Sequence, residues 1–246
     1  EILDLFKITN TDIFKNLNLG IDPKIFTSDQ IKKFFLKNNR ITVISKNLID
    51  YISKTQSKTD HPFYSLDKKI TGETYIQRIS KISNYLKKQG FDYLFITAPE
   101  NIAWLLNIRG KDNPTSPIPN CNLLINKEKE FYLIAKQKKS KKLIKEKKLK
   151  KKQIIEPKYL FNFLKNLKKG KILVDKKTCS LFLENLLEKR FKLVKKEDPI
   201  YLLKSLKNKT EIKNMINAHI LDGAALTKFL FWIKKINKKK ITEVEA

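Results

Sequence analysis

The stretch Asp92-Tyr-Leu-Phe-Ile-Thr97-Ala-Pro99-Glu-Asn-Ile-Ala-Trp104-Leu-Leu106 joins a run rich in aromatic and β-branched residues to a helix-forming run. The first run predicts a strand over Asp92–Thr97, because such residues fit the half-buried surface of a sheet. The second predicts a helix over Pro99–Leu106, with Pro99 in the first turn, where its missing N–H costs least. A strand that leads directly into a helix is typical of an α/β layer.

The same alternation continues on both sides of this stretch. A helix predicted over 74–89 precedes it and ends at Gly90, which suits a left-handed C-terminal cap. A hairpin follows, with strands at Cys121–Ile125 and Phe131–Ala135 around a polar turn. Three helix-strand pairs complete the pattern, at 137–148 with 153–155, 158–167 with 171–174, and 178–188 with 191–195. Strands separated by helices predict an α/β fold, a mixed sheet with flanking helices.

The N-terminal residues predict the end of another domain. Residues 17–22 and 40–45 predict two strands, with a helix over 27–38 between them. Two strands are too few to make a closed domain, so we expect a domain whose front lies outside this sequence. Residues 53–72 carry no apolar period and contain Pro and Gly, which predicts a polar linker.

A long amphipathic helix is predicted over about 208–236, after Asp198-Pro199 interrupts the alternation. Its apolar face comprises Ile212, Met215, Ile216, Ile220, Ala224, Leu226, Phe229, Leu230 and Ile233. An apolar face of this kind normally packs against another apolar surface. We expect it to be poorly buried in this chain, because the domain that it would cover lies beyond Ala246.

The formal net charge of +28 raises the question of nucleic-acid binding, since basic surfaces attract phosphate. Only four of the 53 basic residues are arginines, whereas specific recognition relies on the planar arginine fork. The densest run, Lys136–Lys152, carries Leu143, Ile144 and Leu149 at helical intervals, which predicts a solvated helix face over a buried stripe. We expect neither nucleic-acid nor membrane binding, and 41% hydrophobic residues indicate a folded core.

Few residues are suited to metal or redox chemistry. Cys121 and Cys179 are the cysteines, His61 and His219 are the histidines, and neither pair has metal-ligand spacing. Cysteines of this kind suit a reducing compartment, so the predicted location is cytoplasmic. No apolar run reaches the 18 residues that indicate a membrane-spanning helix.

The irregular loop after the central helix is the best candidate for a functional site. Residues 107–119 hold three prolines, and ordered loops of this length often carry function. The candidate residues are Trp104, Arg109 and Asp112. One interpretation makes Trp104 a core residue and has Arg109 bind backbone carbonyls of its own loop. The other interpretation places Arg109 and Asp112 at the edge of a substrate cleft between domains.

Four segments, in order along the chain, resemble the large three-domain aminopeptidases P, which are Xaa-Pro aminopeptidases. Asn101-Ile-Ala-Trp104-Leu-Leu-Asn107-Ile-Arg109-Gly110-Lys-Asp112-Asn-Pro114-Thr-Ser-Pro117 is similar to a signature of their middle domain. The segment Lys209–Trp232 resembles the start of their C-terminal pita-bread catalytic domain. Gly20-Ile-Asp22-Pro23 with Asn47-Leu-Ile-Asp50 resembles the end of their first domain, and the segment from His61-Pro62 to Gly72-Glu73 resembles the junction that follows it.

This resemblance implies an organisation into creatinase-like domains. Residues 1–56 would be the C-terminal part of a first creatinase-like domain, 57–72 a linker, and 73–200 a second creatinase/prolidase N-terminal-like α/β domain. Residues 201–246 would hold a linker and the first helix of a truncated catalytic domain. The chain would thus be an N-terminal fragment of a longer enzyme.

The resemblance also implies an activity for the full-length protein. Family members are metalloaminopeptidases that release the N-terminal residue before proline, so their substrates are peptides with proline at the second position. They use two divalent metal ions, typically manganese, held by two Asp, one His and two Glu, and they often form homodimers. None of these ligand motifs occurs in this chain, so we expect it to hold no catalytic residue and no metal ligand, and to be inactive alone.

Two other function classes stay open from the sequence. The chain is also compatible with a pita-bread relative that has lost catalysis and serves as a binding or scaffold module. A lysine-rich nucleic-acid-binding α/β protein is the second alternative. One departure also affects the site: the family commonly has a Ser-Tyr or similar aromatic pair leading into the hairpin, where this chain has Asn120-Cys121-Asn122.

Overall fold

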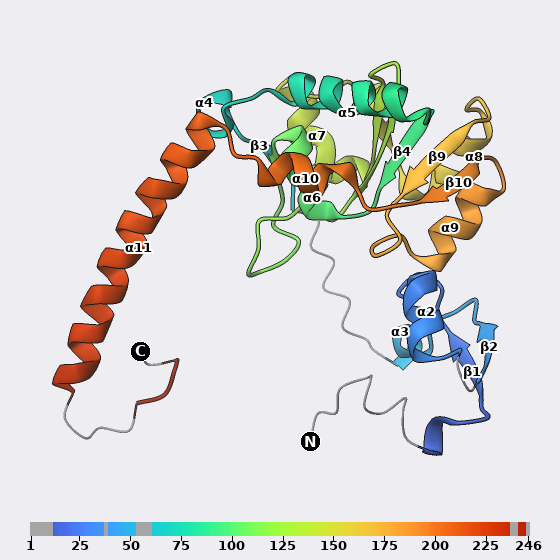
Figure 1. Cartoon of the computed structure of the whole chain (residues 1–246), viewed down its shortest axis with the longest axis horizontal. Coiled ribbons are helices and arrows are strands. Elements are labelled where there is room, and N and C mark those ends of the chain that lie inside the picture. Colours follow the sequence, from blue (N-terminus) through green and yellow to red (C-terminus); the bar gives the residue numbers. More distant parts are fainter. Residues whose placement is uncertain (1–11, 37–38, 53–60, 237–240, 245–246) are drawn as a thin grey trace. The chain divides into compact units, whose positions relative to one another are not determined.

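The computed structural model describes residues 12–36, 39–52, 61–236 and 241–244 (Figure 1). Their internal contacts divide these residues into two compact units. The first unit holds the described residues up to Leu66 together with Glu73–Ser205. The second unit holds Asp67–Gly72 and the described residues from Leu206 onward.

A six-stranded mixed sheet lies at the centre of the first unit, in the order β10-β9-β4-β6-β7-β8. The strands are β4 (Tyr93–Ile96), β6 (Asn122–Asn126), β7 (Phe131–Ile134), β8 (Ile154–Ile155), β9 (Lys171–Val174) and β10 (Lys192–Lys195). β4 runs parallel to β9 and antiparallel to β6. β10 is parallel to β9, β6 and β7 form an antiparallel hairpin, and β8 is parallel to β7. The predicted mixed sheet is therefore confirmed.

Helices pack on both faces of this sheet, as the two apolar cores show. The first core joins the sheet to α5 (Tyr75–Gln89), α6 (Pro99–Leu106), α7 (Gln137–Lys145) and α10 (Pro199–Ser205). The second core joins it to α8 (Leu160–Lys165) and α9 (Leu181–Glu188). Leu94 and Ile96 of β4 enter the first core and Tyr93 and Phe95 enter the second, since side chains of a strand alternate between faces. Burying each such side chain contributes about 1.5–3 kcal/mol.

Local signals place the helices where the sequence predicts them. Thr74 and Gln77 form a reciprocal capping box at the start of α5. Gly90 ends this helix in the left-handed conformation, with φ 70°, as predicted. Pro99 lies in the first turn of α6.

Several short elements lie where the sequence predicts none. The predicted linker contains β3 (Tyr64–Ser65) and α4 (Lys68–Thr71), and the predicted loop begins with β5 (Ile108–Arg109). The helix α10 begins at Pro199 itself. Single 3-10 turns complete the first unit at η1 (Asp12–Phe14), η2 (Lys151–Gln153) and η3 (Pro157–Tyr159).

The N-terminal part of the first unit is a small parallel pair of strands with two helices. The elements are β1 (Asn18–Ile21), α2 (Ser28–Phe34), β2 (Arg40–Val43) and α3 (Leu48–Ile52). Ile31 and Phe35 are buried in a small apolar cluster with Ile21 of β1. This part joins α9 through main-chain hydrogen bonds, and the buried carboxylate of Glu184 accepts from Ser28 Oγ (3.1 Å) and Lys195 Nζ (2.6 Å).

In the second unit, the long helix α11 (Lys209–Lys235) is held at its start by α4. Asn208 caps α11 and also donates from Nδ2 to the carbonyl of Thr71 (2.9 Å). None of the described residues of α11 is buried, and Ile220, for example, is 64% exposed. The prediction of a poorly buried apolar face is confirmed.

A buried polar cluster ties α10 to α6 and to the end of β9. Asp198 accepts from the Ile200 backbone N–H (2.9 Å) and from Asn101 Nδ2 (2.8 Å). The Asp198 backbone N–H donates to Asp175 Oδ2 (3.0 Å), and Lys204 Nζ donates to Asn101 Oδ1 (2.6 Å). Burial raises the pKa of the Asp198 carboxyl to about 6, because desolvation outweighs the two hydrogen bonds that favour the carboxylate.

We predict that this carboxyl makes stability depend on pH in an acidic window. The folded-state pKa of about 6 lies above the ordinary value of 3.8, so the folded state binds the proton more tightly. The contribution of Asp198 to the free energy of unfolding should therefore fall by about 2 kcal/mol as pH rises from 4 to 6. Urea unfolding of wild type and Asp198→Asn at both pH values measures this difference, and a pH-independent difference would contradict it.

Candidate functional site

The loop from Asn107 to Asn120 leaves α6 and returns to β6. Asn107 has φ 54° and ψ 37°, a left-handed conformation that asparagine tolerates better than most residues. β5 then pairs antiparallel with β3, with Tyr64 opposite Arg109. The Gly110 N–H donates to the Pro117 carbonyl (3.2 Å), which closes the loop on itself.

Arg109 contacts backbone carbonyls in this structure. Its Nη1 donates to Ala103 O (3.0 Å) at the end of α6 and to Ile108 O (2.9 Å). Burial lowers the pKa of its guanidinium from the ordinary value. These are the contacts that the first of the two sequence interpretations describes.

Asp112 fixes the end of the loop that leads into β6. One carboxylate oxygen accepts from Lys139 Nζ of α7, and the other accepts from the Asn120 backbone N–H (2.7 Å). The side chains of Asp112 and Lys139 are each only 9% exposed. Because both oxygens already accept a hydrogen bond, this carboxylate is a structural anchor of the loop in the chain as it stands.

Trp104 lies on α6 and is partly buried against the first core. Its ring stacks against the guanidinium of Arg78, whose Cζ lies 4.0 Å from the ring centroid. The three predicted residues thus lie close together in the chain, with Trp104 on α6 and Arg109 and Asp112 on the loop that follows it. Each of them contacts another part of the protein.

A hollow of about 390 Å³ lies beside this loop, and the three predicted residues do not line it. Its lining comprises Tyr64, Gly110, Lys111, Asn113, Pro114, Thr115, Ser116 and Pro117. The aromatic ring and the prolines supply apolar surface, and the ammonium of Lys111 is exposed. Within the described part of the chain Lys111 has no ion pair, so its charge is available to a ligand. No sequence pattern points to Tyr64, because a two-residue strand has no detectable period.

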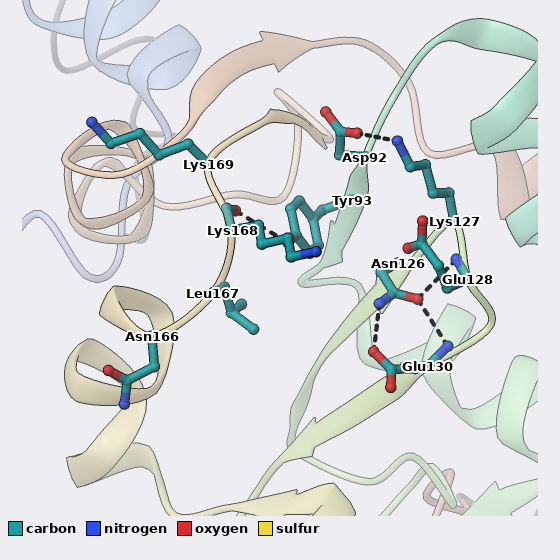
Figure 2. A pocket seen from close by; sticks show the side chains of 10 residues that line it. All are labelled: Asp92, Tyr93, Asn126, Lys127, Glu128, Glu130, Asn166, Leu167, Lys168 and Lys169. Atoms are coloured by element: carbon teal, nitrogen blue, oxygen red, sulfur yellow. Dashed lines mark hydrogen bonds and ion pairs between the residues drawn. The ribbon is translucent and has the colours of Figure 1, made fainter.

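A second hollow, of about 520 Å³, lies at the other end of β4 (Figure 2). It is lined from the start of β4, the turn between β6 and β7, and the segment Asn166–Lys169 before β9. Two of its charged groups bind one another, because Lys127 Nζ donates to Asp92 Oδ1 at 2.6 Å. The register pairs Tyr93 with Asn126 at this end and Ile96 with Leu123 at the end near the candidate loop. The two hollows are therefore separate sites.

A family model for the Creatinase/Prolidase N-terminal domain matches residues 54–211, which include the whole six-stranded sheet and the candidate loop. The chain belongs to this family. The proposed resemblance to aminopeptidases P is also supported along nearly the whole chain by individual relatives.

Two of these relatives are curated aminopeptidases. The chain is 31% identical to "Xaa-Pro aminopeptidase 1" of Dictyostelium discoideum over 91% of its length, and 25% identical to "Probable Xaa-Pro aminopeptidase P" of Coprinopsis cinerea over 89%. It covers only 38% and 39% of those proteins. The chain thus spans about two fifths of the length of the relatives that it matches.

A solved structure shows the same fold. The X-prolyl aminopeptidase of Caenorhabditis elegans, described as a cytosolic enzyme with a di-nuclear active site, superposes with a TM-score of 0.78. The match covers 96% of this chain and 40% of that protein, at 22% identity. At this identity the similarity concerns the fold alone.

Among the described residues, no helix is long and apolar enough to cross a membrane. No group of three or more His, Cys, Asp or Glu side chains among them is placed to hold a metal ion.

We predict that Asp112→Asn destabilises the first unit. The substitution leaves the ammonium of Lys139 buried without its counter-charge, which typically costs about 3 kcal/mol in the free energy of unfolding. Urea unfolding measures this loss. Glu197→Gln is the matched control, because its ion pair with Lys177 is exposed and should have no measurable effect. Equal stability of Asp112→Asn and wild type would show that the pair is not an anchor.

We also predict that Gly110→Ala displaces the loop. A Cβ at this position would lie 2.7 Å from Pro119 Cα and 3.1 Å from Ile118 O, both backbone atoms that cannot rotate away. We expect a loss of about 1–3 kcal/mol in thermal unfolding. The control is Gly223→Ala in α11, where no atom lies within 4 Å and helix propensity should add up to about 1 kcal/mol. Identical melting of Gly110→Ala and wild type would contradict the close approach.

Proposed function

We propose that this chain is the N-terminal, non-catalytic part of a metal-dependent aminopeptidase that releases the residue preceding proline. The observation that carries the proposal is the 31% identity to a curated Xaa-Pro aminopeptidase across 91% of the chain. The match runs through both the N-terminal part and α11, so it is not limited to a domain shared with other enzymes. The substrates proposed on this basis are peptides with proline at the second position.

The proposed domain organisation keeps the boundaries expected from the sequence. Residues 1–56 form the end of a first creatinase-like domain, 57–72 a linker, 73–200 the second domain, and 201–246 a linker with the first helix of the catalytic domain. The exposed apolar face of α11 supports the last assignment, because a stable helix with such a face normally packs on a partner. The partner proposed here is the catalytic domain of the same polypeptide.

We assign the candidate loop to one wall of the substrate cleft. Trp104, Arg109 and Asp112 act in it by fixing the loop, and the hollow beside Tyr64 and Lys111 is the surface offered to the peptide. The apolar surface of this wall and the exposed ammonium of Lys111 suit the apolar side chains and the terminal carboxylate of a short peptide. The contacts that fix the loop support this assignment, as does the 31% identity to a curated Xaa-Pro aminopeptidase.

The described residues do not fit a di-metal site, because they bring no cluster of metal ligands together. We propose that two divalent ions, with manganese as the first candidate, bind in the catalytic domain outside this chain. The relative described as cytosolic, with its di-nuclear site, supports this proposal and a cytoplasmic location. A homodimer is proposed for the full-length protein.

The test is an assay of the full-length protein that contains this chain. We expect it to hydrolyse a tripeptide with proline at the second position and not its alanine analogue. Chelation should abolish the activity and added Mn²⁺ should restore it. Residues 1–246 alone should show neither hydrolysis nor Mn²⁺ binding by calorimetry. Inactivity of the metal-loaded full-length protein would favour the alternative of a degenerate binding module.

A further inference from the structure

Three of the four arginines donate to backbone carbonyls at or near the C-terminal end of a helix. Arg109 and Arg78 both do so on α6, at Ala103 O and Trp104 O respectively. Arg190 does so just beyond α8, where it donates to Leu167 O from Nε (3.0 Å) and Nη2. The carbonyls at the C-terminal end of a helix carry its negative partial charge, so cations stabilise them.

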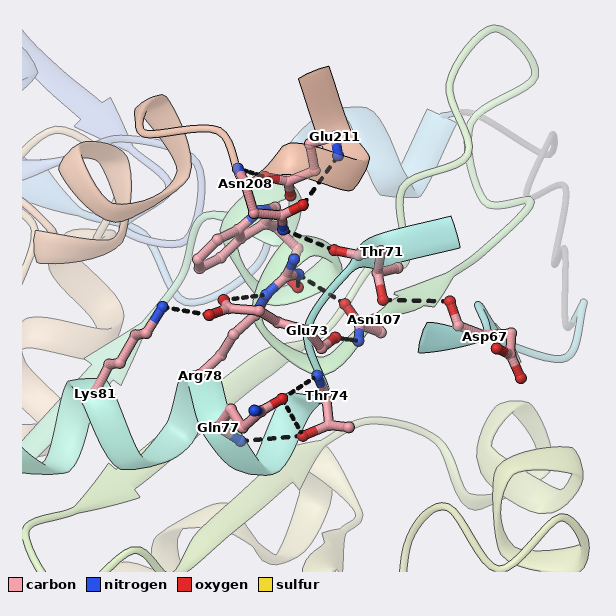
Figure 3. A network of polar contacts seen from close by, with 11 residues as sticks. Asp67, Thr71, Glu73, Thr74, Gln77, Arg78, Lys81, Asn107, Asn208 and Glu211 are labelled. Atoms are coloured by element: carbon pink, nitrogen blue, oxygen red, sulfur yellow. Dashed lines mark hydrogen bonds and ion pairs between the residues drawn. The ribbon is translucent and has the colours of Figure 1, made fainter. Parts of the chain in front are cut away.

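Arg78 has the most demanding surroundings of the three. Its side chain is only 1% exposed, although a buried charge is costly unless it is well paired. Its Nη1 donates to Trp104 O and to Asn107 Oδ1 (2.7 Å), and its Nε lies 3.6 Å from Glu73 Oε2. The face of the guanidinium meanwhile lies against the ring of Trp104, at 4.0 Å. Figure 3 shows Arg78 between Glu73 and Asn107.

A lysine could not make this set of contacts. Its ammonium is a compact point charge, whereas the guanidinium is flat and can stack on a ring while it donates in its own plane. The chain contains 53 basic residues and only four arginines, so an arginine at this position is not explained by the general basic composition.

The contacts of Arg78 fix the residue from which the candidate loop departs. Both polar atoms of the Asn107 side-chain amide are hydrogen-bonded. Oδ1 accepts from Arg78, and Nδ2 donates to Glu73 O (2.7 Å). Its left-handed backbone turns the chain out of α6, and its carbonyl accepts from the Leu66 N–H (2.8 Å), beside β3. Asn107 therefore sets the direction in which β5 leaves α6, and β5 leads directly into Gly110 and the hollow.

We infer that Arg78 is a positioning residue for substrate binding: acting through Asn107, it sets the loop Gly110–Pro117 in the place where that loop contacts the peptide. The inference rests on the proposed function. Arg78 itself does not line the hollow, so its effect on a substrate passes through the loop.

The experiment uses the full-length protein, with Arg78→Lys and Asn107→Gly as variants. Glycine keeps the left-handed backbone and removes only the amide that Arg78 holds, so it is the variant that should fold without difficulty. We expect faster amide exchange by mass spectrometry in the segments that contain Leu66 and Gly110, and unchanged exchange in β4 and β6. We also expect kcat/KM on a proline-containing tripeptide to fall about tenfold, mainly through KM, because the loop binds and does not react.

Arg190→Lys is the matched control, because it removes a similar contact to a helix-end carbonyl away from the loop. It should change neither the exchange of the loop nor KM. Unchanged exchange around Gly110 in Asn107→Gly would overturn the inference whether or not the protein is a peptidase. Faster exchange with unchanged KM in an active enzyme would also overturn it. An inactive wild type would overturn the proposed function and the substrate part of the inference, and the exchange data would still decide whether Arg78 holds the loop.

Discussion

All four residues of β4 are buried, so this strand must be covered on both of its faces and paired along both of its edges. β9 pairs with one edge of β4 in parallel, and β6 pairs with the other edge antiparallel, which makes the sheet mixed. Helices on both sides supply the faces. The candidate loop connects α6, which packs on one face, to β6, which pairs with one edge, so its two ends are held by the parts of the fold that have least freedom.

The loop combines a rigid frame with a free surface. Arg78 and Arg109 hold its root through carbonyls of α6, and Asp112 holds its exit through Lys139 and the Asn120 N–H. Between these two anchors lie the loop residues that line the hollow, Gly110, Lys111 and Asn113–Pro117. Sites that bind ligands are commonly built in this way, because anchors remove the entropy that ordering the loop would otherwise cost on binding.

Much of this fold could be predicted from the sequence, because the period of the apolar residues distinguishes the longer helices and strands. The strand at Tyr93–Ile96, the helix at Pro99–Leu106 and the hairpin were all predicted within a residue or two of their observed bounds. Short elements such as β3 and β5 were not, since two residues have no period. The role of Arg78 was also beyond prediction, because its partner Trp104 lies 26 residues away and only the packing of α5 on α6 brings them together. The candidate residues Arg109 and Asp112 were correctly placed on the loop, but the lining of the hollow depends on which way each side chain points.

The two cysteines lie in different layers of the structure, Cys121 in the first core and Cys179 in the second. Burial raises the pKa of both thiols, that of Cys179 to about 12, so neither reacts as a thiolate while its layer is closed. Each side of the sheet therefore holds one unreactive thiol, which becomes reactive only when that layer opens. The rates at which the two become accessible to a thiol reagent would distinguish local opening of one layer from unfolding of the whole unit, without any substitution in the protein.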